Sequence, residues 1–337
     1  MEKQTKPKFK ILCIDGGGIK GIYSAQLLAK FEEIFKIQIS DCFDMICGTS
    51  TGGIIALAAS LKIPMKDVVS FYEQDGPKIF NEKYKKTCLG RWWRYLKQIC
   101  IGGKYSNHHL RNALEKVFGN RKISESHNFL CIPAYNINTA IPRVFKKNYS
   151  EFTEDDRKSY VDVALATAAA PTYFPVVEIE EDQYADGGLW ANNPILVGLT
   201  EFLYKFADDE RFNGLEILSI SSCEKEKGEI HKKLNRGFFN WKNTLFDAYS
   251  IGQSKSAMFL LKRLKGKLNF PFDYKRINNM PLSAEEAALV DMDNASCASL
   301  KLYRKKADNT AINAKMEPEI AHYFKTSKTI NPNEYGK

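Results

Sequence analysis

The stretch from Phe43 to Leu61, FDMICGTSTGGIIALAASL, joins two apolar segments through a loop of glycine, serine and threonine. The first segment has the length of a buried strand, and the second predicts a buried helix. The loop Gly48–Gly52 (GTSTG) matches G-x-S-x-G, the nucleophile elbow in which a strained turn between strand and helix projects a serine hydroxyl. Ser50 is therefore a candidate nucleophile. The alternative is a polar loop in which Ser50 or Thr51 only caps the helix.

A similar unit precedes this one, from Phe9 to Gly21 (FKILCIDGGGIKG). Its loop has the pattern G-x-G-x-x-G after a strand and before a helix, as in a dinucleotide-binding turn. Backbone N–H groups at a helix start also stabilise the oxyanion of a tetrahedral acyl intermediate. Because a carboxylate would repel a pyrophosphate, we expect Asp15 to fix the loop by accepting backbone hydrogen bonds.

These two strand–loop–helix units predict an α/β fold with a central, mostly parallel sheet flanked by helices. Later strand-like segments are 129–137, 142–147 and 215–221, and a hairpin is expected within 174–184. A helix of small residues, DVALATAAA, should stop before Pro171.

The strongest motifs lie in residues 9–220, which we assign to one catalytic domain with an aromatic and basic helical insertion at about 64–118. Residues 221–337 are predicted to form a mainly helical extension packed on the same domain. Within that extension, the periodicity predicts an inward helix face that carries Trp241, Leu245, Tyr249, Phe259 and Leu264.

The chain has 337 residues and a formal net charge of +9 at pH 7. Hydrophobic residues make up 44% and charged residues 26%, which is typical of a globular protein. The positive charge favours anionic partners such as phospholipid surfaces, nucleotides or nucleic acid, without choosing among them. No apolar run reaches the length of a transmembrane helix, and no secretory signal is predicted. The eight cysteines form no CxxC pair, so we expect free thiols in a reducing compartment and a cytoplasmic protein.

A serine nucleophile needs a base, and the five histidines offer no motif for one. The chain order of an α/β-hydrolase would leave only His231 or His322, which lie in charged or polar segments. Asp186-Gly187-Gly188, in contrast, follows a strand and leads into a tight turn. There the Asp186 carboxylate could take the serine proton directly. Without Ser50, the same tripeptide would predict only a β-turn.

Together these residues resemble the patatin-like phospholipase family. The resemblance covers roughly residues 9–220 and rests on GGGIKG, GTSTG, ATAAAPTYFP and ADGGLWANNP in the order that the family has them. The last motif contains DGG where many members have DGA. The resemblance implies a three-layer α/β fold and a lipid acyl hydrolase of the phospholipase A type. It also implies an acyl-serine intermediate with no metal or other cofactor.

Carried over to this chain, the resemblance implies a dyad of Ser50 as nucleophile and Asp186 as general base. It implies an oxyanion hole from the backbone of Gly16, Gly17 and Gly18. Lys20 stands where the family usually has Arg or Lys beside that hole. The remaining residues that support the motifs are Asp15, Gly21, Gly48, Gly52, Gly187 and Gly188. Asn192 and Asn193 are expected to brace the Asp186 loop.

The expected substrate is membrane phospholipid, reached at the inner membrane surface. The segment 91–97 mixes aromatic and basic residues, as an interfacial surface would. Some bacterial members of the family are anti-phage effectors that cyclic oligonucleotides switch on. The basic segments 225–236 and 255–263 are candidates for such an activator, and a ligand that bridged two protomers would drive a homo-oligomer. No DNA or RNA polymer is expected as a partner.

Two other functions stay open at this point. A nucleotide-binding oxidoreductase of the Rossmann type would use the first glycine loop, but it predicts an acidic residue at the end of the second strand, and Asp44 opens that strand instead. A catalytically idle binding or storage protein on the patatin fold is the other alternative. The intact Ser50 and Asp186 argue against it.

Overall fold

The computed structural model describes residues 6–80, 103–149, 154–225, 234–235 and 238–335. The aromatic and basic segment 91–97, His231 and most of the basic segment 225–236 lie outside the described residues. Within the described ranges, no helix is both long enough and apolar enough to cross a membrane.

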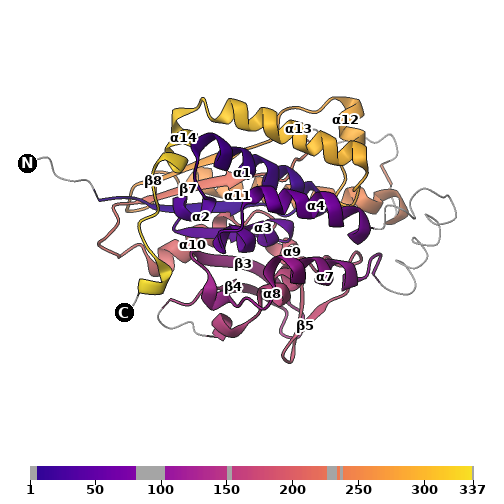
Figure 1. The fold of residues 1–337 in the computed structure, drawn as a ribbon, viewed down its shortest axis with the longest axis horizontal. Coiled ribbons are helices and arrows are strands. Elements are labelled where there is room, and N and C mark those ends of the chain that lie inside the picture. Colours follow the sequence, from indigo (N-terminus) through magenta and orange to yellow (C-terminus); the bar gives the residue numbers. More distant parts are fainter. Residues whose placement is uncertain (1–5, 81–102, 150–153, 226–233, 236–237, 336–337) are drawn as a thin grey trace, which may run out of the picture.

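One eight-stranded sheet forms the centre of the molecule, in the order β5-β6-β3-β2-β1-β7-β8, with β4 paired to β3 (Figure 1). The strands β3, β2, β1, β7 and β8 are parallel to one another. On the other side of β3, β4 and β6 run antiparallel to β3, and β5 runs antiparallel to β6. The mostly parallel sheet that the sequence predicted is therefore confirmed. The strands are β1 Phe9–Ile14, β2 Met45–Gly48, β3 Phe129–Asn136, β4 Ile141–Lys146, β5 Val177–Ile179, β6 Asp182–Asp186, β7 Leu215–Ile220 and β8 Phe272–Ile277.

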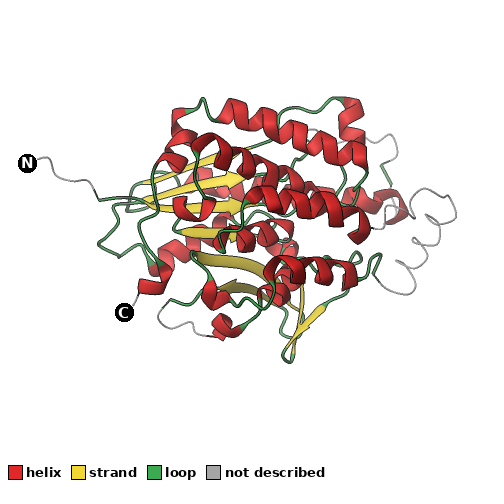
Figure 2. Ribbon diagram, viewed as in Figure 1, coloured by secondary structure: helices red, strands yellow, loops and turns green. Residues whose placement is uncertain are grey.

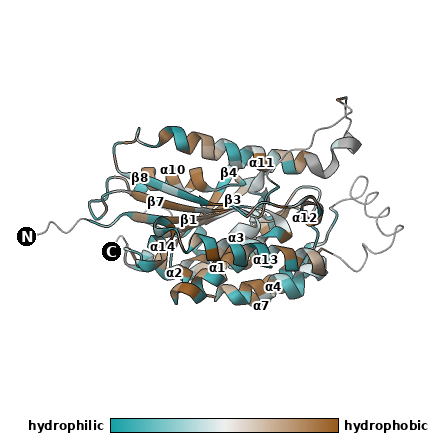
Figure 3. Ribbon diagram, turned by 90° about the horizontal axis from the view of Figure 1, so that it is seen from above, coloured by the Kyte–Doolittle hydropathy of each residue, from teal (hydrophilic) through white to brown (hydrophobic). Residues whose placement is uncertain are grey.

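Helices cover both faces of this sheet, as Figures 2 and 3 show. Alternate residues of β1 point to opposite faces, so that Leu12 and Ile14 belong to one hydrophobic cluster and Ile11 and Cys13 to the other. The first cluster packs against α1 Gly21–Phe35, α3 Thr51–Ser60, α4 Met65–Ile79, α7 Asn107–Phe118, α8 Tyr160–Thr167, α13 Cys297–Ala314 and α14 Pro318–Lys325. The second packs against α10 Ile195–Lys205 and α11 Phe238–Leu264. Short helices are α2 Ile39–Cys42, α9 Gly188–Ala191 and α12 Ala284–Leu289.

The predicted inward face of α11 is wrong for most of its residues. Trp241, Leu245, Tyr249 and Phe259 are exposed, and of the five predicted residues only Leu264 packs against the core. The inward positions are instead small or polar for much of the helix, including Gln253, Ser254 and Ala257. Hydrophobic periodicity assigns the apolar face to the core. It fails here because the core side of α11 bonds polar loop groups at Gln253 and Ser254 and packs against the second hydrophobic cluster only further along, from Ala257 onward.

The helix of small residues is α8, and it ends at Thr167, before the predicted stop at Pro171. The predicted hairpin is confirmed by the antiparallel pair β5 and β6. The cysteines Cys13, Cys47 and Cys131 are buried free thiols, as expected.

The last strand, β8, was not predicted, and it carries a residue that changes the interpretation of Asp15. Arg276 lies on β8 and donates from Nη1 to Asp15 Oδ1 at 2.8 Å and from Nη2 to Asp15 Oδ2 at 2.6 Å. Ser254 of α11 also donates to Asp15 Oδ2, at 3.2 Å. The prediction that backbone N–H groups donate to Asp15 is therefore wrong. A bidentate ion pair holds the start of the glycine loop, with Asp15 fully buried and the Arg276 side chain 9% exposed.

Replacement of Arg276 by methionine is expected to lower the free energy of unfolding by about 3–5 kcal/mol, because it leaves the Asp15 carboxylate buried without a counter-ion. When Asp15 has already been replaced by asparagine, Arg276→Met should lower the free energy of unfolding by at least ~1 kcal/mol less than it does in the wild-type protein, because no unpaired charge remains. Urea unfolding of the four proteins of this cycle measures both values.

The neighbouring Lys275 provides the control for this cycle. Its ammonium pairs with Glu319 at the surface, where both side chains are partly exposed, so Lys275→Met should cost less than ~1 kcal/mol. Strictly additive effects of the Asp15 and Arg276 substitutions would contradict the structural role of the ion pair.

Candidate active site

Ser50 lies at a strained turn between β2 and α3. Its backbone has φ 55° and ψ −123°, in a region that residues with a side chain rarely adopt. The flanking glycines permit the turn, because a Cβ on Gly48 would clash with the carbonyl of Gly52, and a Cβ on Gly52 would clash with the carbonyl of Ile14. The main chains of the two loops thus touch, and Gly21 allows α1 an equally close approach to Thr51.

The capping alternative for this loop is wrong. Ser50 occupies the N-cap position of α3 without a side-chain capping hydrogen bond, and the Thr51 hydroxyl shares a short hydrogen bond with Tyr72 Oη. Thr167, at the end of α8, accepts a hydrogen bond from the Ser50 backbone N–H at 3.0 Å and donates to the carbonyl of Pro133 at 2.5 Å. Thr167 therefore fixes the turn, a role for which its place in ATAAAP is the only signal in the sequence.

The Ser50 hydroxyl donates a hydrogen bond of 2.7 Å to Asp186 Oδ2, although the two residues are 136 positions apart. Asp186 ends β6, which runs antiparallel to β3 and so points its last residue back toward the end of β2. The other carboxylate oxygen, Oδ1, accepts a hydrogen bond of 2.6 Å from the Gly188 backbone N–H. The structure thus brings the predicted pair together, in a geometry that allows direct proton transfer.

Asp186 is only 3% exposed, and this burial raises the pKa of its carboxyl group to about 6. The hydrogen bonds from Ser50 and Gly188 act in the opposite direction and limit the increase. Among the described residues, no histidine forms a hydrogen bond with Ser50 or Asp186. His322, for example, pairs with Glu216 at 3.3 Å.

The glycine loop after β1 lies against this pair. A Cβ on Gly16 would be 3.3 Å from Ser50 Cβ. The Gly16 N–H donates to the carbonyl of Asn192 at 2.9 Å, so one of the three predicted oxyanion donors is already engaged. Gly18 has φ +60°, and a side chain there would clash with the carbonyl of Met292. Within the described chain, the N–H groups of Gly17 and Gly18 have no hydrogen-bond acceptor and remain available to an anion.

The loop after Asp186 is held mainly from α11. Gln253 accepts from the Asn192 backbone N–H at 3.0 Å and donates to the Leu189 carbonyl at 2.9 Å. Asn193 Nδ2 donates to Ser254 Oγ at 3.3 Å, and Ser254 in turn bonds Asp15. The expected bracing by Asn192 and Asn193 thus involves partners on α11, which the sequence motifs did not indicate. Gly187 is needed because a Cβ there would clash with the carbonyl of Pro133.

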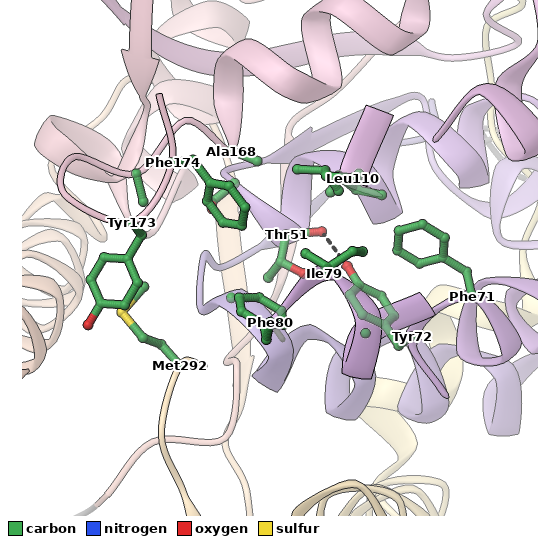
Figure 4. A pocket seen from close by; sticks show the side chains of 15 residues that line it. Thr51, Phe71, Tyr72, Ile79, Phe80, Leu110, Ala168, Tyr173, Phe174 and Met292 are labelled. Atoms are coloured by element: carbon green, nitrogen blue, oxygen red, sulfur yellow. Dashed lines mark hydrogen bonds between the residues drawn. The ribbon is translucent and has the colours of Figure 1, made fainter. Parts of the chain in front are cut away.

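Two pockets of different character meet at Ser50. The first is almost wholly apolar; Figure 4 shows the rings of Phe71, Tyr72, Phe80 and Phe174 around it. Its walls come from α3, α4, α7 and the segment 168–174. Part of the predicted insertion at 64–118 therefore builds this pocket, a contribution that the weak motifs in that region did not reveal.

The second pocket has both polar and apolar side chains in its lining, and we call it the polar pocket because it is the more polar of the two. The glycine loop and Asp186 form one side of it, and α11 contributes Phe246, Asp247, Ser250 and Ile251 to the other. Lys20 also lines this pocket, where its ammonium group forms no hydrogen bond or ion pair with the described residues. Among these residues, no group of three or more His, Cys, Asp or Glu side chains is placed to hold a metal ion.

Comparison with known proteins gives consistent similarities over this region. The family model for patatin-like phospholipases matches residues 12–199. A cGAMP-activated phospholipase from Pseudomonas aeruginosa is 33% identical over 80% of this chain and 79% of its own. A protein of the same description from Vibrio cholerae is 30% identical over 88% and 89%. Patatin-like protein 4 from Arabidopsis thaliana is 26% identical over 98% and 92%.

Proposed function

Because the chain belongs to the patatin-like phospholipase family, whose members are lipid acyl hydrolases, we propose that Ser50 and Asp186 hydrolyse fatty-acyl esters of membrane phospholipids. The observation that carries this assignment of roles is the 2.7 Å hydrogen bond from the Ser50 hydroxyl to the buried Asp186 carboxylate. Because the chain belongs to this family, the first glycine loop is interpreted as part of a hydrolase site and not as the dinucleotide-binding turn of an oxidoreductase.

In the proposed reaction, the Ser50 oxygen attacks the ester carbonyl carbon while Asp186 Oδ2 takes the hydroxyl proton. The carbonyl oxygen becomes negatively charged, and it accepts hydrogen bonds from the N–H groups of Gly17 and Gly18. Collapse of this intermediate breaks the ester bond, and the proton on Asp186 passes to the departing lysophospholipid. Water then attacks the acyl-serine with Asp186 again as base, which releases the fatty acid and regenerates the hydroxyl.

The two pockets suggest how a phospholipid lies during this reaction. The apolar pocket matches a fatty-acyl chain, because its lining consists almost only of aliphatic and aromatic side chains. The polar pocket lies on the other side of Ser50 and matches the glycerol and head group. The scissile ester, which joins the apolar and polar parts of the lipid, then lies at the Ser50 hydroxyl.

The regulation that the relatives' names describe leads to a second proposal. Because the bacterial relatives are cGAMP-activated phospholipases, we propose that a cyclic oligonucleotide also activates this chain, that binding drives a homo-oligomer, and that the enzyme acts at the inner membrane surface in anti-phage defence. Such control would protect the cell's own membrane from a complete catalytic dyad. Candidate phosphate partners among the described residues are Lys225, Lys255, Lys262 and Arg263.

Substitution of either dyad residue tests the proposed reaction directly. Ser50→Ala should lower kcat by up to about a million-fold, and Asp186→Asn should be nearly as damaging, because asparagine keeps the shape but cannot accept a proton. A fluorophosphonate probe should label the wild-type protein and not Ser50→Ala. His127→Ala and His322→Ala serve as controls that retain activity. Loss of activity in a histidine variant with a normal fold would instead indicate a triad hydrolase.

The pH dependence follows from the pKa of Asp186. The carboxyl group must be deprotonated to act as base, and burial raises its pKa to about 6. We therefore expect kcat/KM on an uncharged short-chain ester to fall tenfold per pH unit below about pH 6 and to level off above it. A profile that stays flat down to pH 4.5, in protein that remains folded, would contradict Asp186 as base.

The proposed activation predicts low turnover of phospholipid vesicles until an activator is added. Turnover is measured with and without a panel of cyclic di- and trinucleotides, and the mass of Ser50→Ala in solution is followed with the same panel. At least one member should raise turnover tenfold or more and increase the mass. High basal turnover that no member of the panel changes would indicate a constitutive lipase.

A further inference from the structure

The outward side of α11 exposes large apolar side chains along most of its length. Trp241, Leu245, Tyr249, Phe259 and Leu260, which we call the α11 stripe, are 37–57% exposed. At one edge of the stripe, Tyr249 and Leu260 also line a groove beside α9 and α10, and the Tyr249 hydroxyl donates to the Leu189 carbonyl. At 100° per residue these five positions fall within about a third of the helix circumference. Water-soluble surfaces seldom carry so many large apolar side chains on one helix face, and such a patch indicates a binding surface.

The opposite side of the same helix belongs to the active site. Phe246, Asp247, Ser250 and Ile251 line the polar pocket that also contains Ser50. Figure 3 shows α11 as the outer layer on its side of the sheet, above α10. One helix therefore separates the α11 stripe from the pocket, so a surface that covers the stripe also lies beside the site of ester cleavage.

The charge of α11 indicates which partner covers the stripe. The sequence of the helix contains four basic residues and a single acidic one, Asp247. Lys255, Lys262 and Arg263 are exposed, and the Arg263 guanidinium lies 5.2 Å from the centre of the Phe259 ring. Aromatic side chains beside lysine and arginine are typical of helices that lie in the interface of an anionic bilayer. A second copy of this chain would instead bring basic helix against basic helix, at a net charge of +9 on each copy.

We propose that α11 is the membrane-docking element, with the α11 stripe inserted among the head groups of an anionic phospholipid bilayer. The inference rests on the proposed lipid substrate, but it concerns a surface outside the two pockets that meet at Ser50. Docked in this way, the bilayer lies against the outer face of the helix whose inner face lines the polar pocket.

The test separates binding to vesicles from catalysis. Full-length Ser50→Ala protein is mixed with vesicles of phosphatidylethanolamine and phosphatidylglycerol, and the bound fraction is measured by sedimentation. Adding Leu245→Ser and Phe259→Ser should weaken this binding at least ~10-fold, because each removes an apolar side chain from the interface. Vesicles of phosphatidylcholine, which lack net charge, should bind the parent protein more weakly than the anionic vesicles.

Ile141→Ser with Ile312→Ser is the matched control, since these residues are 58% and 53% exposed on β4 and α13. This pair should bind vesicles like the parent protein. With Ser50 restored, the α11 variant should hydrolyse p-nitrophenyl butyrate within about twofold of wild type. It should lose turnover on vesicles, measured with the cyclic nucleotide that most raises wild-type turnover. The two proposals can therefore fail separately. If the wild-type protein proved to have no esterase activity, the vesicle-binding assay would still test the docking surface.

Two results would overturn the proposal. One is unchanged vesicle binding by the α11 variant. The other is a reduced mass of the α11 variant in solution with no effect on vesicle binding, which would assign the α11 stripe to contacts between copies of this chain.

Discussion

The buried ion pair between Asp15 and Arg276 connects the parts of the molecule on which the site depends. Asp15 ends β1 and begins the glycine loop, whereas Arg276 lies on β8, 261 residues later. A carboxylate with no exposure to water is costly unless a counter-ion and further hydrogen bonds compensate it, and here the guanidinium and Ser254 supply both. The glycine loop, the last strand and α11 therefore have to assemble together.

That assembly determines the composition of the active site. The Ser50 turn and Asp186 come from the ends of β2 and β6, and the glycine loop packs against both. These elements supply the reacting groups, but they do not enclose a substrate. The apolar pocket is completed by α4 and α7, and the polar pocket by α11. The proposed catalytic groups thus come from the ends of strands, while the walls come from helices whose sequences carry little pattern.

Helix α11 holds the loop after Asp186, lines the polar pocket and presents an exposed apolar surface. Its inner face bonds the loop after Asp186 through Gln253 and contacts Asp15 through Ser254. Its outer face carries the α11 stripe. A shift of this helix would therefore change the loop of the proposed base, the wall of the polar pocket and the surface presented to a membrane at the same time. The proposed cyclic nucleotide control has a natural target in such an element.

The local sequence was sufficient to predict those features that depend on the backbone conformation of a few consecutive residues. GTSTG predicts a strained turn because only glycine fits beside it, and alternating strands and helices around two such loops predict a parallel sheet. The amino-acid sequence alone could therefore predict that Ser50, Asp186 and the glycine loop lie together, whereas several other features depend on contacts between distant segments. Sequence could not reveal that Arg276 is the partner of Asp15, that the Gly16 N–H is already engaged, or that Thr167 and Gln253 hold the two loops. It also assigned the wrong face of α11 to the core, because periodicity measures apolar character and not what lies opposite. Only the tertiary structure decides which face meets the protein interior, since that depends on which surfaces other parts of the chain leave uncovered.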